Sequence, residues 1–279
     1  MAVVSHTLPV KLPCIMGILN VTPDSFSDGG LFAKREPAVA RGLELAAQGA
    51  AVIDVGGEST RPGSASVSAE LEAARVLPVI EGLRAAGLEQ LISIDTSKAV
   101  VARAALDAGA TMVNDVTALR GDPELAHVVA EAGCPVCLMH MQGAPRTMQV
   151  SPYYDDVVGE VGAFLAERFS AALLAGVRSE AVLLDPGIGF GKTLEHNLLL
   201  LRNLDRLAAL GRPLVLGTSR KRFLGELLGV EPPERVLGSA VTTALGLAAG
   251  ALIFRVHDVP ANLQALTVAK AVLTAGEEA

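Results

Sequence analysis

Three polar residues at the ends of apolar runs could together bind a flat, polar ligand. Asp95, Asn114 and Asp185 each follow a short run rich in Val, Ile or Leu. An unpaired carboxylate on an apolar strand is costly, so each side chain must find a partner. Carboxylates accept two parallel hydrogen bonds and an amide both donates and accepts, which suits the amino and ring N–H groups of a heterocycle. Internal pairing with arginines of the same fold is the alternative, but three such residues favour the ligand.

Basic side chains gather at three other places in the chain. They are Arg61, the run 220–222 (Arg-Lys-Arg), and Arg255 with His257. The formal net charge is −7, from 23 basic and 30 acidic residues, so this clustering is local. Arginine contacts phosphate in a bidentate manner and histidine adds a donor, so the basic residues predict a phosphate site. For the run 220–222, an exposed surface face is the alternative.

Charge and composition exclude several classes of protein. A chain of net charge −7 lacks the overall positive field of a nucleic-acid-binding protein, whereas 51% hydrophobic residues can bury a large core. Residues 236–254 carry no charge, but Gly250 splits them into a helix-like and a strand-like stretch, so we expect no membrane span. The N-terminus shows no basic stretch followed by an apolar one, which predicts a cytoplasmic protein.

Eight short apolar runs alternate with helical segments and predict an α/β fold. The runs are residues 14–19, 51–55, 91–94, 111–113, 136–139, 182–184, 213–217 and 251–254. Helical periodicity is clear over residues 38–45, 70–83, 100–106, 157–174, 198–210 and 263–273. Apolar strands alternating with helices indicate a parallel sheet covered on both faces, and eight such units favour a (β/α)₈ TIM barrel over an open sheet. We expect a single domain over residues 1–279, with a core of about 14–275 and the polar residues at the carboxyl ends of the strands.

Two short motifs are poor matches to other sites. The Gly191-Lys192 pair resembles the end of a phosphate-binding P-loop, but Pro186 stands where that loop needs glycine. Lys192 likewise occupies the place of the third glycine of a dinucleotide-binding fingerprint. Cys134 and Cys137 form one CxxC without a second pair, so buried structural thiols are favoured over a zinc site.

Longer motifs carry a resemblance to a known family. They are residues 16–30 (MGILNVTPDSFSDGG), 53–63 (IDVGGESTRPG), 94–97 (IDTS), 114–115 (ND), 185–192 (DPGIGFGK), 217–225 (GTSRKRFLG) and 255–257 (RVH). In this order they closely resemble the bacterial dihydropteroate synthases of the pterin-binding family. That resemblance implies a TIM barrel, a cytoplasmic homodimer, and a reaction joining 6-hydroxymethyl-7,8-dihydropterin diphosphate to p-aminobenzoate with release of pyrophosphate.

The resemblance also implies roles for particular residues. The pterin ring would be held by Asp95, Asn114, Asp185 and Lys221, with Met139 against it. The diphosphate would be bound by Thr60, Arg61, Arg255 and His257, and Asn20 would contribute to a Mg²⁺ site. Two loops, residues 21–32 and 57–68, would shape the p-aminobenzoate pocket with Phe26, Thr60, Pro62, Phe190 and Ser219. Sulfonamides, which present a similar aniline, are expected to compete for that pocket.

The expected mechanism is an SN1-like substitution, because an electron-rich dihydropterin can stabilise a carbocation at its methylene carbon. Asp95, Asp185, Lys221 and Arg255 are the predicted catalytic residues. Asp95 and Asp185 would oppose the positive charge on the ring while Arg255 stabilises the departing diphosphate. Three alternatives remain open: a pterin-binding methyltransferase, a Schiff-base aldolase using Lys221, and a pterin-binding protein without activity.

Overall fold

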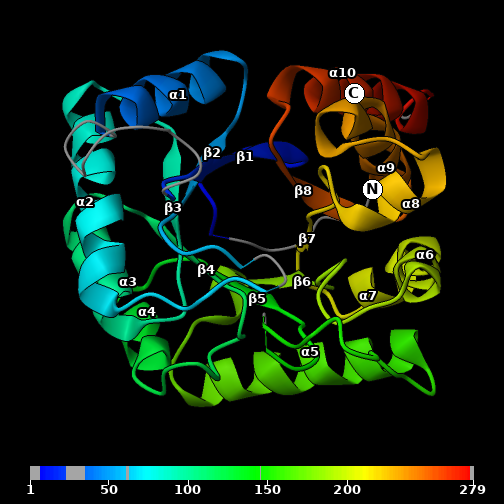
Figure 1. The fold of residues 1–279 in the computed structure, drawn as a ribbon, viewed down its shortest axis with the longest axis horizontal. Helices are drawn as coiled ribbons and strands as arrows, with labels where there is room; N and C mark the ends of the chain where they lie inside the picture. Colours follow the sequence, from blue (N-terminus) through cyan, green and yellow to red (C-terminus); the bar gives the residue numbers. More distant parts are fainter. Residues whose placement is uncertain (1–6, 23–34, 61–62, 145, 277–279) are drawn as a thin grey trace.

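The protein folds as a closed barrel of eight parallel strands, seen end-on in Figure 1. This computed structural model describes residues 7–22, 35–60, 63–144 and 146–276. Each strand pairs with the next along the chain, and β8 returns to pair with β1. The strands are β1 (Cys14–Asn20), β2 (Val52–Gly56), β3 (Leu91–Asp95), β4 (Met112–Asp115), β5 (Val136–Met139), β6 (Val182–Asp185), β7 (Leu214–Leu216) and β8 (Ala251–Val256). The predicted TIM barrel is therefore confirmed.

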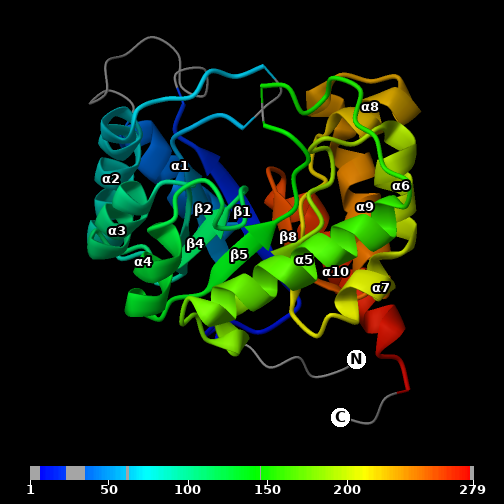
Figure 2. The same cartoon turned by 90° about the horizontal axis from the view of Figure 1, so that it is seen from below.

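Helices surround the barrel on its outer side (Figures 1 and 2). They are α1 (Arg35–Ala47), α2 (Ala69–Ala85), α3 (Ala99–Asp107), α4 (Leu125–Ala132), α5 (Val157–Leu174), α6 (Leu194–Arg202), α7 (Leu204–Ala208), α8 (Arg222–Leu228), α9 (Val236–Ala248) and α10 (Val259–Leu273). The described residues also include the 3₁₀ turns η3 (Ser179–Ala181) and η4 (Pro232–Arg235). One prediction is wrong: residues 198–210 are not one helix but parts of α6 and α7. The break lies at Asn203, whose side chain donates to the Leu199 carbonyl.

The uncharged segment 236–254 divides as expected. Its first part is α9, its last part is β8, and Gly250 between them adopts φ +96°, which a residue with a side chain rarely adopts. Among the described residues, no helix combines the length and the apolar character needed to span a bilayer.

Alternation along the strands produces two separate cores. Outward-facing residues such as Ile53 and Val113 pack against the helices, in a cluster that includes most buried apolar side chains. Inward-facing residues such as Met16, Val52 and Met112 fill the lower half of the barrel. The segment before β1 covers this end of the barrel through Leu8. The barrel is therefore a packed core below, and only its upper interior is available to polar side chains.

The three cysteines take part in this packing. Cys14, Cys134 and Cys137 are buried and unpaired, and burial raises the pKa of the Cys14 thiol to about 12. Over the described part of the chain, no group of three or more His, Cys, Asp or Glu side chains could hold a metal ion. Burial of the three cysteine side chains agrees with the expected structural thiols.

Candidate active site at the carboxyl ends of the strands

The predicted acceptor residues converge inside the upper end of the barrel. Asp95 on β3 pairs in register with Asn114 on β4, and Met139 on β5 pairs with Asp185 on β6. Each lies on the inward face of its strand, two or four residues beyond a side chain of the lower core, because side chains alternate with a period of two. The barrel thus brings three acceptors from three strands to one place.

Arg255 joins this group through two carboxylates. Its Nε donates to Asp54 Oδ2 at 2.6 Å, and one terminal nitrogen donates to Asp95 Oδ2 at 2.7 Å. Asn114 Nδ2 also donates to Asp54 Oδ2, at 3.1 Å. Internal pairing, which was the alternative for the buried carboxylates, thus holds in part: Asp95 and Asp54 share one guanidinium. The role predicted for Arg255 in diphosphate binding remains a prediction, and two of its nitrogens are occupied by carboxylates.

Lys221, Asp185 and Arg255 approach one another around Gly217. A Cβ atom added to Gly217 would lie 3.8 Å from Lys221 Nζ and 3.9 Å from both Asp185 Oδ2 and Arg255 Cβ. The other oxygen of Asp185 accepts from the Gly187 N–H at 2.7 Å, which fixes the carboxylate. Lys221 Nζ donates to the Ile188 carbonyl and lies 4.6 Å from the centre of the Phe190 ring. A lysine and a carboxylate that lie this close together can bind a ligand with both donors and acceptors.

The neighbours of Lys221 point elsewhere. Arg220 adopts φ +58° and its guanidinium pairs with Asp258, whereas Arg222 is exposed and pairs with Glu226 on its own helix. Of the basic run 220–222, only the middle residue therefore faces the site. The left-handed backbone at Arg220 is the reason, because it turns successive side chains in different directions.

Ser219 and His257 form a small hydrogen-bonded pair beside Lys221. The His257 N–H donates to Ser219 Oγ at 3.1 Å, and Ser219 Oγ lies 3.1 Å from His257 Nδ1. A hydroxyl can donate one hydrogen bond and accept two, so the direction of the second contact depends on the tautomer of the His257 ring. The pair fixes the position of the ring beside Lys221.

The Gly-rich segment after β6 owes its glycines to close packing. A Cβ on Gly187 would lie 1.8 Å from the His140 carbonyl oxygen, and one on Gly191 would lie 2.4 Å from the Gln142 carbonyl oxygen. Lys192 is 3% exposed, and its Nζ contacts the Gly187 and Phe190 carbonyls and His140 Nδ1 at 2.9 to 3.0 Å. It is a buried structural lysine and no phosphate-loop residue.

Burial shifts the pKa values of Asp95, Asp185 and Lys221 in the direction that favours the neutral form of each group. It raises the pKa of Asp95 to about 7, a shift that Arg255 reduces and Asp54 increases, and it also raises the pKa of Asp185. Burial lowers the pKa of Lys221 to about 8, against the effect of Asp185. For Arg255, burial acts to lower the pKa, but Asp54 and Asp95 outweigh it and the value is raised. Perturbed groups that converge in one place are typical of an active site.

The remaining predicted residues are only partly within the described structure. Met139 packs with Met141, Met148 and Phe190 in a small apolar cluster beside the acceptors. Thr60 and Asn20 are half-buried, and Asn20 is the last residue of β1. The predicted residues Phe26, Arg61 and Pro62 lie outside the described residues, as does most of the loop 21–32.

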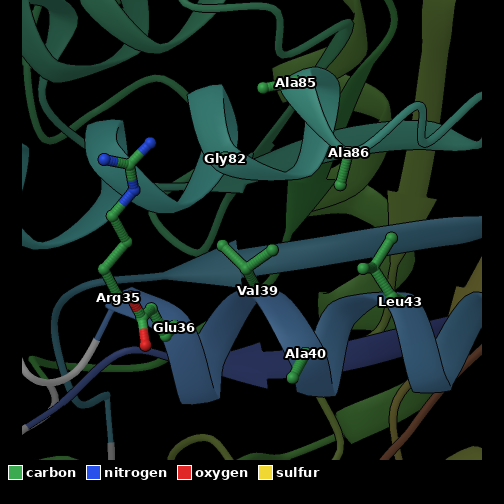
Figure 3. A pocket seen from close by; sticks show the side chains of 8 residues that line it. All are labelled: Arg35, Glu36, Val39, Ala40, Leu43, Gly82, Ala85 and Ala86. Carbon is green, nitrogen blue, oxygen red and sulfur yellow. The ribbon is translucent and has the colours of Figure 1, made fainter.

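A separate groove lies between α1 and α2, on the outer layer of helices (Figure 3). Its volume is about 450 Å³. Most of the residues that line it are small or apolar, and it has one basic and one acidic residue. The lining residues are Arg35, Glu36, Val39, Ala40, Leu43, Gly82, Ala85 and Ala86. None of the predicted site residues lines it, so it is distinct from the barrel mouth.

Sequence reasoning did not assign Asp54 or the buried pair of Lys192 and His140. Asp54 is fully buried and contacts two predicted site residues, Arg255 and Asn114. The sequence did contain a signal. Asp54 is a lone carboxylate in a strand of Val, Ile and Gly, and it lies on the same face of the strand as Gly56 at the strand end. No comparable signal marked Lys192, whose acceptors are mostly backbone carbonyls.

Comparison with known proteins now places this geometry in a family. The family model described as "Pterin binding enzyme" matches residues 16–257. The chain belongs to the pterin-binding enzyme family. It is 48% identical over 271 residues to the dihydropteroate synthase of Escherichia coli strain K12, which covers 97% of this chain and 95% of the relative.

Solved structures agree with this family. A dihydropteroate synthase of Xanthomonas albilineans, solved with 4-aminobenzoic acid, is 52% identical, with a TM-score of 0.88 over 94% of this chain and 93% of that one. The same protein in complex with 7,8-dihydropteroate is 50% identical at a TM-score of 0.85, over 94% of each chain. The Yersinia pestis enzyme, solved as a sulfonamide drug complex, is 43% identical at a TM-score of 0.90, over 98% of this chain and 100% of that one.

Proposed function

We propose that this chain joins 6-hydroxymethyl-7,8-dihydropterin diphosphate to p-aminobenzoate, giving 7,8-dihydropteroate and pyrophosphate. This is the transferase activity of a dihydropteroate synthase, for which the E. coli, Xanthomonas and Yersinia relatives are named. One observation carries the proposal: four side chains converge at the upper end of the barrel, those of Asp95, Asn114, Asp185 and Lys221. That set offers acceptors and donors to a pterin ring.

The reaction needs no nucleophilic side chain. The bond between the methylene carbon and the diphosphate oxygen breaks, the electron pair leaves with pyrophosphate, and a carbocation remains that the dihydropterin ring stabilises. The neutral aniline nitrogen of p-aminobenzoate attacks that carbon and loses one proton to solvent. Asp95 and Asp185 oppose the positive charge on the ring, while Arg255 and His257 stabilise the leaving group. Positioning of the two substrates supplies much of the remaining rate enhancement.

The residues present fit a magnesium ion that arrives with the substrate. The described chain offers no cluster of carboxylates for a cation, and Asn20 supplies one neutral oxygen at the end of β1. Mg²⁺ is commonly held by few protein ligands together with substrate phosphates and water. Bound there by Asn20 and the diphosphate, it would neutralise phosphate charge as the leaving group departs.

The Asn20→Ala variant is therefore expected to need more Mg²⁺. Loss of one ligand to a bound ion should raise the half-saturating Mg²⁺ concentration by about tenfold, whereas kcat at saturating Mg²⁺ falls less. Pyrophosphate release measured across a Mg²⁺ series checks this. An unchanged Mg²⁺ response in Asn20→Ala would show that Asn20 only ends the strand.

Activity is expected to follow a narrow bell-shaped pH profile. Asp95 accepts hydrogen bonds as a carboxylate, so kcat/KM for the pterin should fall as pH drops below its pKa of about 7. Lys221 donates most strongly as an ammonium, so kcat/KM should also fall above its pKa of about 8. Initial rates at low pterin concentration between pH 5 and pH 10 report these free-enzyme ionisations. A flat profile over that whole range would contradict both assignments.

We also propose a cytoplasmic homodimer that forms through α9 and α10. Leu237, Val241 and Leu245 are exposed along one stripe of α9, and Val268 and Val272 are exposed on α10, which packs beside it. Helix α9 carries no charged residue. An uncharged apolar stripe can pair with its own copy without bringing like charges together, so a second copy of this chain is the expected occupant.

Light scattering after size-exclusion chromatography tests the dimer. Leu245→Arg should give a monomer, because each copy would then bring a charged side chain into the apolar interface and lose its hydration. Val100→Arg is the matched control, since Val100 is as exposed as Leu245, at 64%, but lies on α3. A monomeric wild-type chain, or equal dissociation by both variants, would refute this interface.

The activity assay separates the proposed function from its three alternatives. A synthase releases pyrophosphate only when both substrates are present, a methyltransferase needs no diphosphate, and a binding protein gives no turnover. Borohydride with a carbonyl substrate would trap a Schiff base on Lys221 only in an aldolase. We expect pyrophosphate release that depends on p-aminobenzoate and no borohydride adduct.

A further inference from the structure

We propose that Asp54 is a positioning residue of the pterin site, which orients both the Asn114 amide and the Arg255 guanidinium. The inference rests on the proposed function and assigns a role to a residue that does not itself face the ligand. Asp54 lies in the middle of β2, is completely buried, and contacts side chains from β4 and β8.

Asp54 determines which end of the Asn114 amide faces the ligand. Its Oδ2 lies 3.1 Å from Asn114 Nδ2 and also accepts from Arg255. A carboxylate oxygen can only accept, so the amide must present its nitrogen to Asp54. The carbonyl oxygen of Asn114 is thereby turned away from Asp54 and can accept a hydrogen bond from an N–H group of the ring. Without Asp54 the amide could rotate and present either end.

Asp54 also limits how Arg255 contacts Asp95. The guanidinium gives its Nε to Asp54 and one terminal nitrogen to Asp95 Oδ2. An arginine facing a single carboxylate commonly forms two parallel hydrogen bonds, which occupy both oxygens. By taking the Nε, Asp54 prevents the side-on arrangement that uses the Nε and one terminal nitrogen, and Arg255 contacts Asp95 through Oδ2, which leaves Asp95 Oδ1 available. The pterin site needs such an acceptor, so the division of Arg255 between two carboxylates preserves it.

A role in stability alone does not account for Asp54. Burying an ionised pair is rarely more favourable than packing apolar side chains in the same volume, and the layer below uses Val52, Leu91 and Met112. Asp54 Oδ1 is buried and has no hydrogen-bond partner among the described residues. A core optimised only for stability would not retain such a group, whereas a site that must orient two polar side chains would.

The Asp54→Asn variant tests this role with nearly unchanged shape. The ligand is 6-hydroxymethyl-7,8-dihydropterin, which lacks the diphosphate and cannot react, and its Kd is measured by calorimetry. We expect a Kd at least about tenfold weaker than that of the wild type, while the KM for p-aminobenzoate at saturating pterin diphosphate changes less than about threefold.

Asp115→Asn is the matched control. Asp115 is also completely buried near the same end of the barrel, but within the described part of the chain its carboxylate accepts only from Thr117 and Leu119 of its own turn. This variant is expected to lower the melting temperature but to keep the pterin Kd within about threefold of the wild type. A similar loss in both variants would overturn the proposal, because burial of any carboxylate would then explain it.

A double-mutant cycle shows whether Asp54 acts through its partner. Asn114→Ala should weaken pterin binding alone, and adding Asp54→Asn to it should cost less than Asp54→Asn costs in the wild type. Full additivity would contradict the claim about the amide.

A measurement on the wild-type chain does not depend on the folding of any Asp54 variant. The side-chain amide protons of Asn114, assigned by comparison with Asn114→Ala, should exchange slowly in the free enzyme. Rapid exchange would overturn the proposal. Wild-type turnover with unchanged binding by Asp54→Asn would reject this inference but leave the proposed function intact, whereas no wild-type turnover would reject the function.

Discussion

Arg255→Met is expected to damage both activity and stability more than any other single change in the site. Arg255 compensates Asp54 and Asp95, and its removal leaves two carboxylates beside each other inside the barrel. Breaking a buried ion pair from one side typically costs about 3–5 kcal/mol, so the melting temperature should fall by on the order of 10 °C. Loss of a donor to the leaving group should lower kcat by at least about a hundredfold. Thermal unfolding and steady-state kinetics measure the two effects.

The pH dependence of Arg255→Met provides an internal check. Without the guanidinium, the folded pKa of Asp95 rises further, because Arg255 is the group that lowers it, so the folded state binds a proton that the unfolded state releases above about pH 4. Stability should therefore recover as pH falls from 8 to 5. Arg222→Met, at an exposed ion pair with Glu226, should leave both stability and kcat nearly unchanged. A variant of Arg255 as stable and active as that of Arg222 would contradict the ion-pair assignment.

Lys221→Met is expected to weaken recognition without damaging the fold. Methionine keeps the aliphatic stem but removes the charge and three donors, one of which reaches the Ile188 carbonyl. Loss of a charged hydrogen bond to a bound ligand costs about 1.5–3 kcal/mol, or roughly ten- to a hundredfold in affinity. We therefore expect weaker pterin binding and a kcat/KM at least about tenfold lower, with a melting temperature nearly unchanged. Calorimetric titration and a melting curve decide this.

The adjacent arginine again provides the control for Lys221. Arg222→Met removes the same charge one residue away, but that side chain is 82% exposed and paired on its own helix. Its pterin affinity should equal that of the wild type. Wild-type affinity in Lys221→Met as well would mean that Lys221 makes no contact with the ligand.

Most of the barrel could be predicted because it is encoded locally. Each strand lies in a short apolar run with polar residues at or after its end, and the longer helices, such as α2 and α5, have clear periodicity. The helices that were missed are short: α4 has 8 residues and α8 has 7. Segments of this length contain about two turns, too few for a helical period to be recognised. The break at Asn203 was also hidden, since the apolar period continues across it.

The sequence predicted which residues form the site better than it predicted which of them pair with one another. Asp95, Asn114 and Asp185 were recognisable because polar residues at strand ends meet at one rim of a barrel. The sharing of Arg255 between Asp54 and Asp95 joins residues 201 and 160 positions apart. Only closure of the barrel brings these residues together, and no local sequence pattern predicts their pairing. The roles of Thr60, His257 and Ser219 toward substrates stay predictions.

One measurement tests the central claim most directly. The purified chain is incubated with 6-hydroxymethyl-7,8-dihydropterin diphosphate, p-aminobenzoate and Mg²⁺, and dihydropteroate and pyrophosphate are both quantified, with Arg255→Met as the inactive control. The proposed function predicts equal amounts of the two products and none when p-aminobenzoate is omitted. Pyrophosphate without dihydropteroate, or no turnover by the wild-type chain, would contradict it.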